Sequence, residues 1–218
     1  MSNRFDLVVF DWDGTLMDST ASIASAIRSA CADLGLAVPS VEQARHVIGM
    51  GLAEALRYAV PELGEADYPR LAERYRFHYL ARDQELVLFD GVEDLLHELR
   101  GRGLLLAVAT GKSRRGLDRV LAQTGLAPLF DATRCADECF SKPHPAMLLE
   151  LMDELGVEPE RTLMIGDTTH DLLMAANAGT PALGLSCGAH PVDQLEGAEP
   201  LAVLDSAEGL RRWLIANA

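Results

Sequence analysis

Two aspartates two residues apart, Asp11 and Asp13, follow a short apolar run near the start of the chain. The run Leu7–Phe10 predicts a buried strand, and Gly14 permits a turn directly after the acids. Open α/β sheets bind ligands at the carboxyl ends of their strands, so the pair indicates acid–base chemistry or a metal site. The same pattern is typical of an ordinary turn, so its meaning depends on the groups at other strand ends.

Two later segments carry groups that could act together with these acids. Thr110 and Gly111 follow the apolar run 104–109 and offer a hydroxyl and a small backbone to an anion, although Thr110 could equally cap a helix. Lys142 precedes a helix that begins at Pro145. A lysine held there could neutralise carboxylates and bind a phosphoryl oxygen; an ordinary surface position is the alternative.

A further pair of acids, Asp167 and Asp171, follows a predicted strand at 162–165. A helix that begins near Thr169 brings both acids to its N-terminal side. His170 between them is either a metal ligand or an exposed histidine in a first helical turn. Four acids in one cleft need a compensating charge, and Mg²⁺ suits carboxylates and phosphate oxygens, whereas Zn²⁺ prefers a cluster of histidines and cysteines. These groups together favour phosphoryl transfer.

The elements that position these groups change character along the chain. Residues 19–88 have helical spacing almost throughout, and from residue 89 apolar strands alternate with amphipathic helices. The strands are expected at 104–109, 132–135, 162–165, 182–185 and 201–204, and the helices at 92–100, 117–123, 145–155, 172–178 and 210–215. This order predicts the α/β class, with a Rossmann-like three-layer α/β/α core around a parallel sheet and an inserted all-helical cap domain.

The insertion predicts two domains. The core is expected to comprise 1–18 and 89–218, and the cap to comprise 19–88. Because the cap follows the first acidic turn, it is expected to lie beside the acids as a lid; a helical decoration that only packs is the alternative.

Composition limits the classes of partner. The chain has 218 residues and a formal charge of −14, which argues against nucleic acid and anionic membranes as partners. No apolar segment approaches the roughly 20 residues of a membrane span, and a cytoplasmic location is expected. Cys135 and Cys139 could form a metal pair, but reduced thiols are the favoured interpretation. The oligomeric state is expected to be monomer or homodimer.

The motifs in order resemble those of the haloacid-dehalogenase-like hydrolase superfamily. They are Asp11-x-Asp13-Gly14-Thr15, Thr110, Lys142-Pro143 and Gly166-Asp167-x-x-x-Asp171. The helical insert is similar to a C1-type cap, and the whole chain looks most like the phosphoglycolate-phosphatase branch. The resemblance implies a Mg²⁺-dependent phosphatase that acts on a small phosphorylated metabolite through an aspartyl-phosphate.

The same resemblance implies a role for each matching residue. Asp11 corresponds to the nucleophile and Asp13 to the general acid and base. Thr110 corresponds to a group that holds phosphoryl oxygens, and Lys142 to the cation that screens nucleophile and phosphoryl group. The implied metal ligands are Asp11, the backbone carbonyl of Asp13, Asp167 and Asp171, the last of which binds the ion directly or through water. The implied phosphate-binding residues are Asp11, Trp12, Asp13, Thr110, Gly111 and Lys142.

Several positions allow more than one interpretation. Trp12 could narrow the pocket or pack in the core, and Lys112 could match a common family lysine or form a surface salt bridge. Residues 45–51 lie where relatives carry a substrate-facing loop, so Arg45, His46 and Gly49 are candidates for substrate specificity. Arg45 or His46 could contact a substrate carboxylate, or could belong to a solvated helix end.

Two rival functions fit part of this pattern. A sugar phosphomutase can use the same core and the same aspartyl-phosphate. A receiver-type signalling module also places acids at strand ends with a lysine nearby, but the helical insert and the Gly166–Asp171 motif count against it.

Overall fold

Residues 4–217 are described by a computed structural model, in which six parallel strands form one sheet in the order β3-β2-β1-β4-β5-β6. The strands are β1 (Leu7–Phe10), β2 (Leu105–Thr110), β3 (Ala132–Cys135), β4 (Thr162–Gly166), β5 (Ala182–Leu185) and β6 (Ala202–Leu204). Each strand was predicted within one residue at either end. The predicted α/β class with a parallel sheet is confirmed.

The central strand β1 lies at the point where the strand order reverses. β1 pairs with β2 on one side and with β4 on the other, and Phe10 stands opposite both Val108 and Ile165. The carboxyl ends of β1 and β4 therefore lie side by side at the centre of the sheet. Doubly wound sheets bind ligands in the crevice at this point, and both acidic motifs of the sequence begin there.

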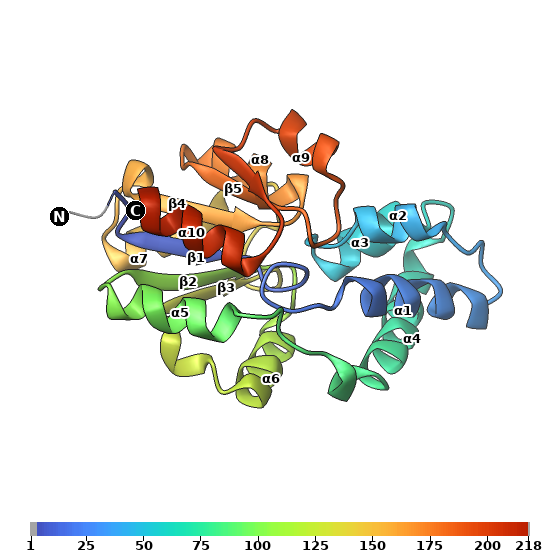
Figure 1. The fold of residues 1–218 in the computed structure, drawn as a ribbon. Coiled ribbons are helices and arrows are strands. Elements are labelled where there is room, and N and C mark those ends of the chain that lie inside the picture. The colour runs from blue at the N-terminus through green and yellow to red at the C-terminus, as the bar shows by residue number, and fades with distance from the viewer. Residues whose placement is uncertain (1–3, 218) are drawn as a thin grey trace.

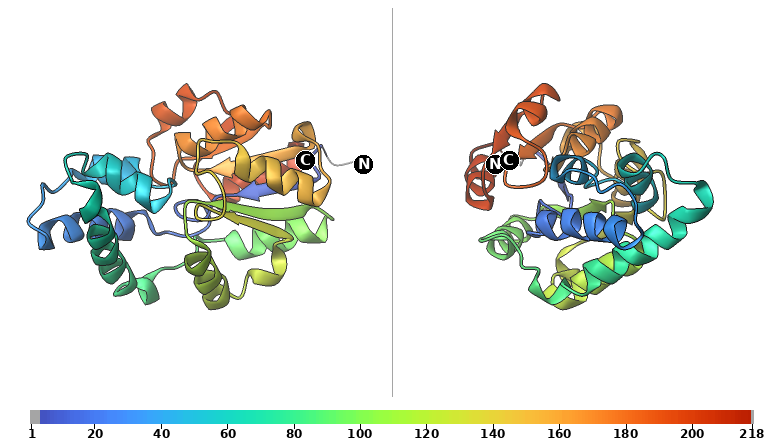
Figure 2. Two further views of the ribbon diagram at one scale, coloured as in Figure 1. Left: turned by 180° about the vertical axis from the view of Figure 1, so that it is seen from behind. Right: turned by 90° about the vertical axis from the view of Figure 1, so that its right-hand side faces the viewer.

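Helices cover both faces of the sheet, as Figures 1 and 2 show. One face packs on α5 (Val92–Gly101), α6 (Arg114–Thr124) and α10 (Ala207–Asn217), and the other packs on α7 (Ala146–Leu155), α8 (Thr169–Ala178) and α9 (Val192–Gly197). Alternate residues of β1 serve the two faces, since Val8 and Phe10 belong to the first core and Leu7 and Val9 to the second. The three-layer prediction is confirmed.

Four helices between β1 and β2 form the helical insert, a name used below for residues 19–88. They are α1 (Thr20–Asp33), α2 (Val41–His46), α3 (Leu52–Ala59) and α4 (Tyr68–Leu80), and they lie to the right of the sheet in Figure 1. A separate apolar cluster joins them, to which Ile23, Ile27 and Leu71 contribute. The predicted boundaries between cap and core stay a prediction.

The helix starts differ most from the predictions. α6 begins three residues before the predicted 117 because the Ser113 hydroxyl accepts a hydrogen bond from the backbone N–H of Gly116. α8 begins at Thr169, three residues before the expected 172 and at the start that the convergence of Asp167 and Asp171 required, since Thr168 and Asp171 form a capping box at its N-terminus. α9 was not predicted, because Leu195 is its one buried residue and no helical stripe is visible in the sequence. Short 3-10 helices lie at 65–67, 83–85, 127–129 and 159–161.

No helix in the described part of the chain is long and apolar enough to cross a membrane.

Candidate active site

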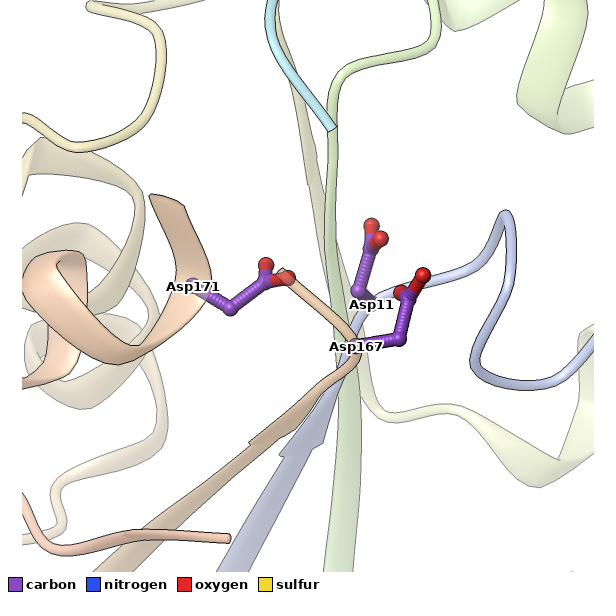
Figure 3. Close-up of side chains that lie close together, drawn as sticks. All are labelled: Asp11, Asp167 and Asp171. Carbon is purple, nitrogen blue, oxygen red and sulfur yellow. The ribbon is translucent and has the colours of Figure 1, made fainter. Parts of the chain in front are cut away.

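Three buried carboxylates meet at the carboxyl ends of β1 and β4. Asp11 follows β1, Asp167 follows β4 and Asp171 lies in the first turn of α8, and one oxygen from each lies within 4.8 Å of the others. Figure 3 shows Asp11 and Asp167 rising side by side from neighbouring strands, with Asp171 pointing toward them from its helix. The sequence predicted that four acids converge, with Asp13 among them; three of the four form this cluster, and Asp13 is not part of it.

Asp167 is held by the turn that follows β1. The Thr15 hydroxyl donates to its Oδ1 at 2.8 Å, and the backbone N–H of Ala189 donates to its Oδ2 at 2.7 Å. Gly14 has φ +83°, and a Cβ atom there would lie 2.1 Å from Asp167 Oδ2. The glycine therefore provides both the left-handed turn and the space for the carboxylate.

Lys142 joins two of the three acids. Its Nζ lies 2.8 Å from Asp11 Oδ1 and 2.6 Å from Asp171 Oδ1, and the lysine side chain is fully buried. The other Asp171 oxygen accepts from the backbone N–H and the hydroxyl of Thr168. The alternative of a surface lysine is therefore wrong, and Asp171 directs Lys142 toward Asp11.

The three acids carry more negative charge than Lys142 neutralises. Burial raises the pKa of Asp11 to about 7, although the positive charge of Lys142 acts to lower this pKa. Burial, together with repulsion from Asp11 and Asp171, raises the pKa of Asp167 well above its ordinary value. Burial alone lowers the pKa of Lys142, but Asp11 and Asp171 outweigh it and hold that pKa above the ordinary value. The cluster thus lacks positive charge.

A hard divalent cation fits this donor set. Oδ2 of Asp11 is buried and has no hydrogen-bond partner among residues 4–217, so an oxygen is available for a ligand. All the donors are carboxylate oxygens, which Mg²⁺ prefers. His170 is not part of the cluster, because its Nε2 lies 2.9 Å from the backbone carbonyl of His46.

The carboxylate of Asp13 lies apart from this cluster and has its own partners. Lys112 Nζ lies 2.9 Å from Asp13 Oδ2, and the Ser19 hydroxyl donates to Asp13 Oδ1 at 2.6 Å. Lys112 also donates to the Tyr79 hydroxyl of the helical insert at 3.0 Å. Burial lowers the pKa of Lys112, but Asp13 and Tyr79 more than compensate and raise it. The side chains of Lys112 and Asp13 are only 9% and 11% exposed, so the pair is largely shielded from solvent and is not a surface salt bridge.

Thr110 and Gly111 lie at the end of β2, next to β1. The Thr110 side chain is buried, and its hydroxyl accepts from the backbone N–H of Lys112 at 3.2 Å. A Cβ atom on Gly111 would lie 2.4 Å from the Met50 carbonyl and 2.6 Å from the Gly49 carbonyl. The loop of the helical insert thus packs directly on the turn after β2.

A cavity of about 740 Å³ opens between the helical insert and the core. Asp11, Asp13 and Lys112 line it from the core, and Ile27, Leu52 and Tyr79 are among the residues that line it from the insert. A volume in this range is typical of a small-molecule site. Both acidic residues of the first motif therefore line a space that can hold a ligand.

The three predicted specificity residues occupy two environments. Gly49 lines the cavity. Arg45 Nη2 instead donates to the Gly188 carbonyl at 2.5 Å, and the His46 ring stacks on His190 with centroids 5.1 Å apart. Arg45 and His46 thus join the insert to the loop after β5, and their role in specificity stays a prediction.

The Trp12 ring packs in the core beneath the site. It is fully buried and lies 6.3 Å from the Phe130 ring, between centroids. The implied role of Trp12 in phosphate binding stays a prediction.

Sequence reasoning missed Ser19, Tyr79 and the backbone N–H of Ala189. Ala189 lies in the loop after β5, so the rule that predicted the other strand ends could have included it. Ser19 and Tyr79 carry no local signal, since Tyr79 is one position on an apolar helix face. Their contacts depend on how the insert packs against the core.

Known proteins resemble this chain over nearly its whole length. A family model described as haloacid dehalogenase-like hydrolase matches residues 8–185. A probable phosphatase, IndB of Dickeya dadantii, is 39% identical over 92% of this chain and 89% of its own. A phosphoglycolate phosphatase of Agrobacterium fabrum is 33% identical over 94% of this chain and 90% of its own.

A solved structure agrees with these sequence relationships. The crystal structure of a predicted phosphatase from Clostridium acetobutylicum superposes with a TM-score of 0.86 and 25% identity, covering 99% of this chain and 100% of that one. The family model, the two relatives and the acidic cluster at the end of β1 agree, and the chain belongs to the haloacid dehalogenase-like hydrolases.

Proposed function

We propose that this protein is a Mg²⁺-dependent phosphatase that hydrolyses the phosphomonoester of a small metabolite through an aspartyl-phosphate. The observation that carries the proposal is Asp11, a buried residue that lines the cavity and whose carboxylate has one unpartnered oxygen, with Lys142 at 2.8 Å from the other oxygen. The names of the similar phosphatases support the same class of reaction.

In the first step, an Asp11 oxygen attacks phosphorus. The Asp–O–P bond forms, the bond from phosphorus to the ester oxygen breaks, and the carboxyl proton of Asp13 goes to the departing oxygen. Lys142 stays beside Asp11 and screens the negative charges of nucleophile and phosphoryl group. The Thr110 hydroxyl and the Gly111 backbone N–H hold phosphoryl oxygens.

In the second step, water hydrolyses the aspartyl-phosphate. Asp13, now a carboxylate, takes a proton from a water molecule whose oxygen attacks phosphorus. The bond between phosphorus and the Asp11 oxygen breaks, which releases inorganic phosphate and regenerates the Asp11 carboxylate. One carboxyl group thus serves as acid and then as base.

Asp11, Asp167, Asp171 and the backbone carbonyl of Asp13 are the residues that would hold Mg²⁺. When bound, the ion supplies positive charge against which the phosphoryl oxygens and the nucleophile can approach each other. Thr15 and Ala189 fix Asp167 for this purpose, since they occupy both of its oxygens from opposite loops.

Phosphoglycolate is the first substrate to test, because it appears in the name of a relative 33% identical to this chain. Identity at this level supports the reaction class more than the substrate. A panel of sugar phosphates, nucleotides and phosphorylated acids should therefore accompany it.

The test is phosphate release from that panel, with Mg²⁺ and with EDTA. We expect release that requires Mg²⁺, is abolished in Asp11→Asn and is kept in Asp18→Asn, an exposed acid of the same loop. Isomerised sugar phosphate without net release would instead indicate a mutase. A phosphorylated Asp11 that persists for hours would indicate a signalling module.

A further inference from the structure

Lys112 connects the helical insert to Asp13, the residue of the core that is predicted to act first as general acid and then as general base. Its Nζ lies 2.9 Å from Asp13 Oδ2 and 3.0 Å from the Tyr79 hydroxyl, and 5.0 Å from the centre of the Tyr79 ring. Tyr79 is buried in α4 of the insert, whereas Lys112 and Asp13 follow β2 and β1. The hydrogen bond therefore forms only while the insert lies against the core.

We propose that Tyr79 is a positioning residue that acts through Lys112 to aim the Asp13 carboxyl group at the ester oxygen of the substrate. This role rests on the proposed phosphatase function. It couples proton transfer to closure of the cavity, because departure of the insert removes the hydroxyl that holds Lys112.

The geometry around Asp13 supports this role. Ser19 anchors Oδ1 at 2.6 Å, so Lys112 at Oδ2 fixes the remaining rotation of the carboxyl group. A carboxylate has about four lone-pair sites, so the two anchors leave sites free for the proton that moves. A lysine side chain is long and flexible, so it can aim a neighbour only when a third group holds it. Tyr79 provides the hydroxyl and the ring for that purpose.

The sequence offers a direct probe of this contact. Lys112 and Lys142 are the two lysines of the chain, so selective isotope labelling of lysine gives two side-chain signals in an NMR spectrum. We expect Tyr79→Phe to shift the Lys112 signal and to leave the Lys142 signal in place. A matched control is Tyr68→Phe, which removes a buried hydroxyl of the same helix that donates to the Val60 carbonyl.

The kinetic test compares two leaving groups. An alkoxide needs a proton as it departs, whereas p-nitrophenolate is stable as an anion and leaves without one. We expect Tyr79→Phe to lower kcat/KM about tenfold for the best alkyl phosphate of the panel and less than about twofold for p-nitrophenyl phosphate. The loss is about tenfold because misdirecting the acid removes only part of the effect of general acid catalysis. Tyr68→Phe should leave both values unchanged.

A second variant tests whether Tyr79 acts through Lys112. Lys112→Met should show the same dependence on the leaving group, and Tyr79→Phe should add no further loss in that background, because residues that act as a unit are not additive. Lys112→Arg should restore part of the activity.

The outcomes separate this role from the proposed function. No phosphate release by the wild-type protein from either ester overturns both. Equal losses on the two esters, additive losses in the double variant, or an unmoved Lys112 signal in Tyr79→Phe overturn the positioning role alone.

Discussion

Lys142 Nζ lies 2.8 Å from Oδ1 of Asp11, and neither side chain has more than a trace of exposed surface. Lys142→Met should therefore leave three buried carboxylates without their positive partner. Breaking a buried ion pair costs about 3–5 kcal/mol, so we expect a loss of that size in the free energy of unfolding, measured in urea with EDTA present.

Mg²⁺ should restore part of this stability, since a cation at the three carboxylates replaces some of the missing charge. The matched comparison is Lys112→Met, which disturbs Asp13 instead of the three-acid cluster. Equal urea midpoints for wild type and Lys142→Met in EDTA would contradict the prediction.

The pKa of Asp11 predicts that Mg²⁺ stabilises the protein more as the pH rises. Burial raises this pKa from 3.8 to about 7. In the metal-free protein the group stabilises the fold fully below pH 3.8, and this contribution is lost as the pH rises through about 7. A metal must displace the proton, so the difference in Tm between Mg²⁺ and EDTA should grow from about pH 6 to about pH 8.

Asp11→Asn provides the control for this pH dependence, because an amide does not titrate. The difference in Tm should then grow less with pH than in the wild-type protein, and the part that remains belongs to Asp167, whose pKa burial also raises. A wild-type difference that is constant over the same range would show that no proton is displaced at Asp11.

The sequence predicts the parts of the site that depend on local pattern. Asp11 and Asp167 each follow an apolar strand, and parallel pairing places such ends at one edge whatever the rest of the chain does. A start of α8 near Thr169 was the condition for Asp167 and Asp171 to converge, and the capping box of Thr168 and Asp171 places it there. Each of these predictions depends on one strand, one turn or one helix terminus.

The contacts that were not predicted depend on how the helical insert packs against the core. Tyr79 meets Lys112 across the boundary between insert and core, and nothing in the spacing of α4 shows which side faces the cavity. Arg45 and His46 are the last two residues of α2 rather than part of a loop, and they contact Gly188 and His190. Side-chain direction at a helix end is set by tertiary packing, which a single sequence does not display.

The turn after β2 should not tolerate a larger side chain. Gly111→Ala would place a Cβ atom 2.4 Å from the Met50 carbonyl and push the loop of the insert away from the site. We expect a loss of about 1–3 kcal/mol in stability, as for other overpacked positions, together with a raised KM. Both are measured by urea unfolding and steady-state kinetics on the best substrate.

Gly101→Ala is the matched control for that variant. Gly101 lies at the end of α5, and a Cβ atom there meets nothing within 4 Å, so stability should be unchanged or slightly higher. If Gly111→Ala behaves like Gly101→Ala, the loop does not press on the turn.

Acid should weaken the contact between insert and core through His190. Its Nδ1 accepts from the backbone N–H of Thr169 at 3.1 Å and its Nε2 faces the His46 carbonyl at 3.0 Å, an arrangement that suits the neutral ring. Burial, with repulsion from His170 and His46, lowers its pKa from 6.5 to about 4. The unfolded chain therefore binds the proton first, and stability present at neutral pH is lost as the pH falls from about 6.5 toward about 4.

The measurement must separate His190 from Asp11 and Asp167, which titrate in the opposite sense. The informative quantity is the difference in unfolding free energy between the wild-type protein and His190→Asn, a variant that keeps an acceptor for Thr169 and does not titrate. We expect this difference to fall by about 2 kcal/mol between about pH 7 and about pH 4.5; a difference that does not change over this range would mean that His190 takes up its proton as easily in the folded protein as in the unfolded chain.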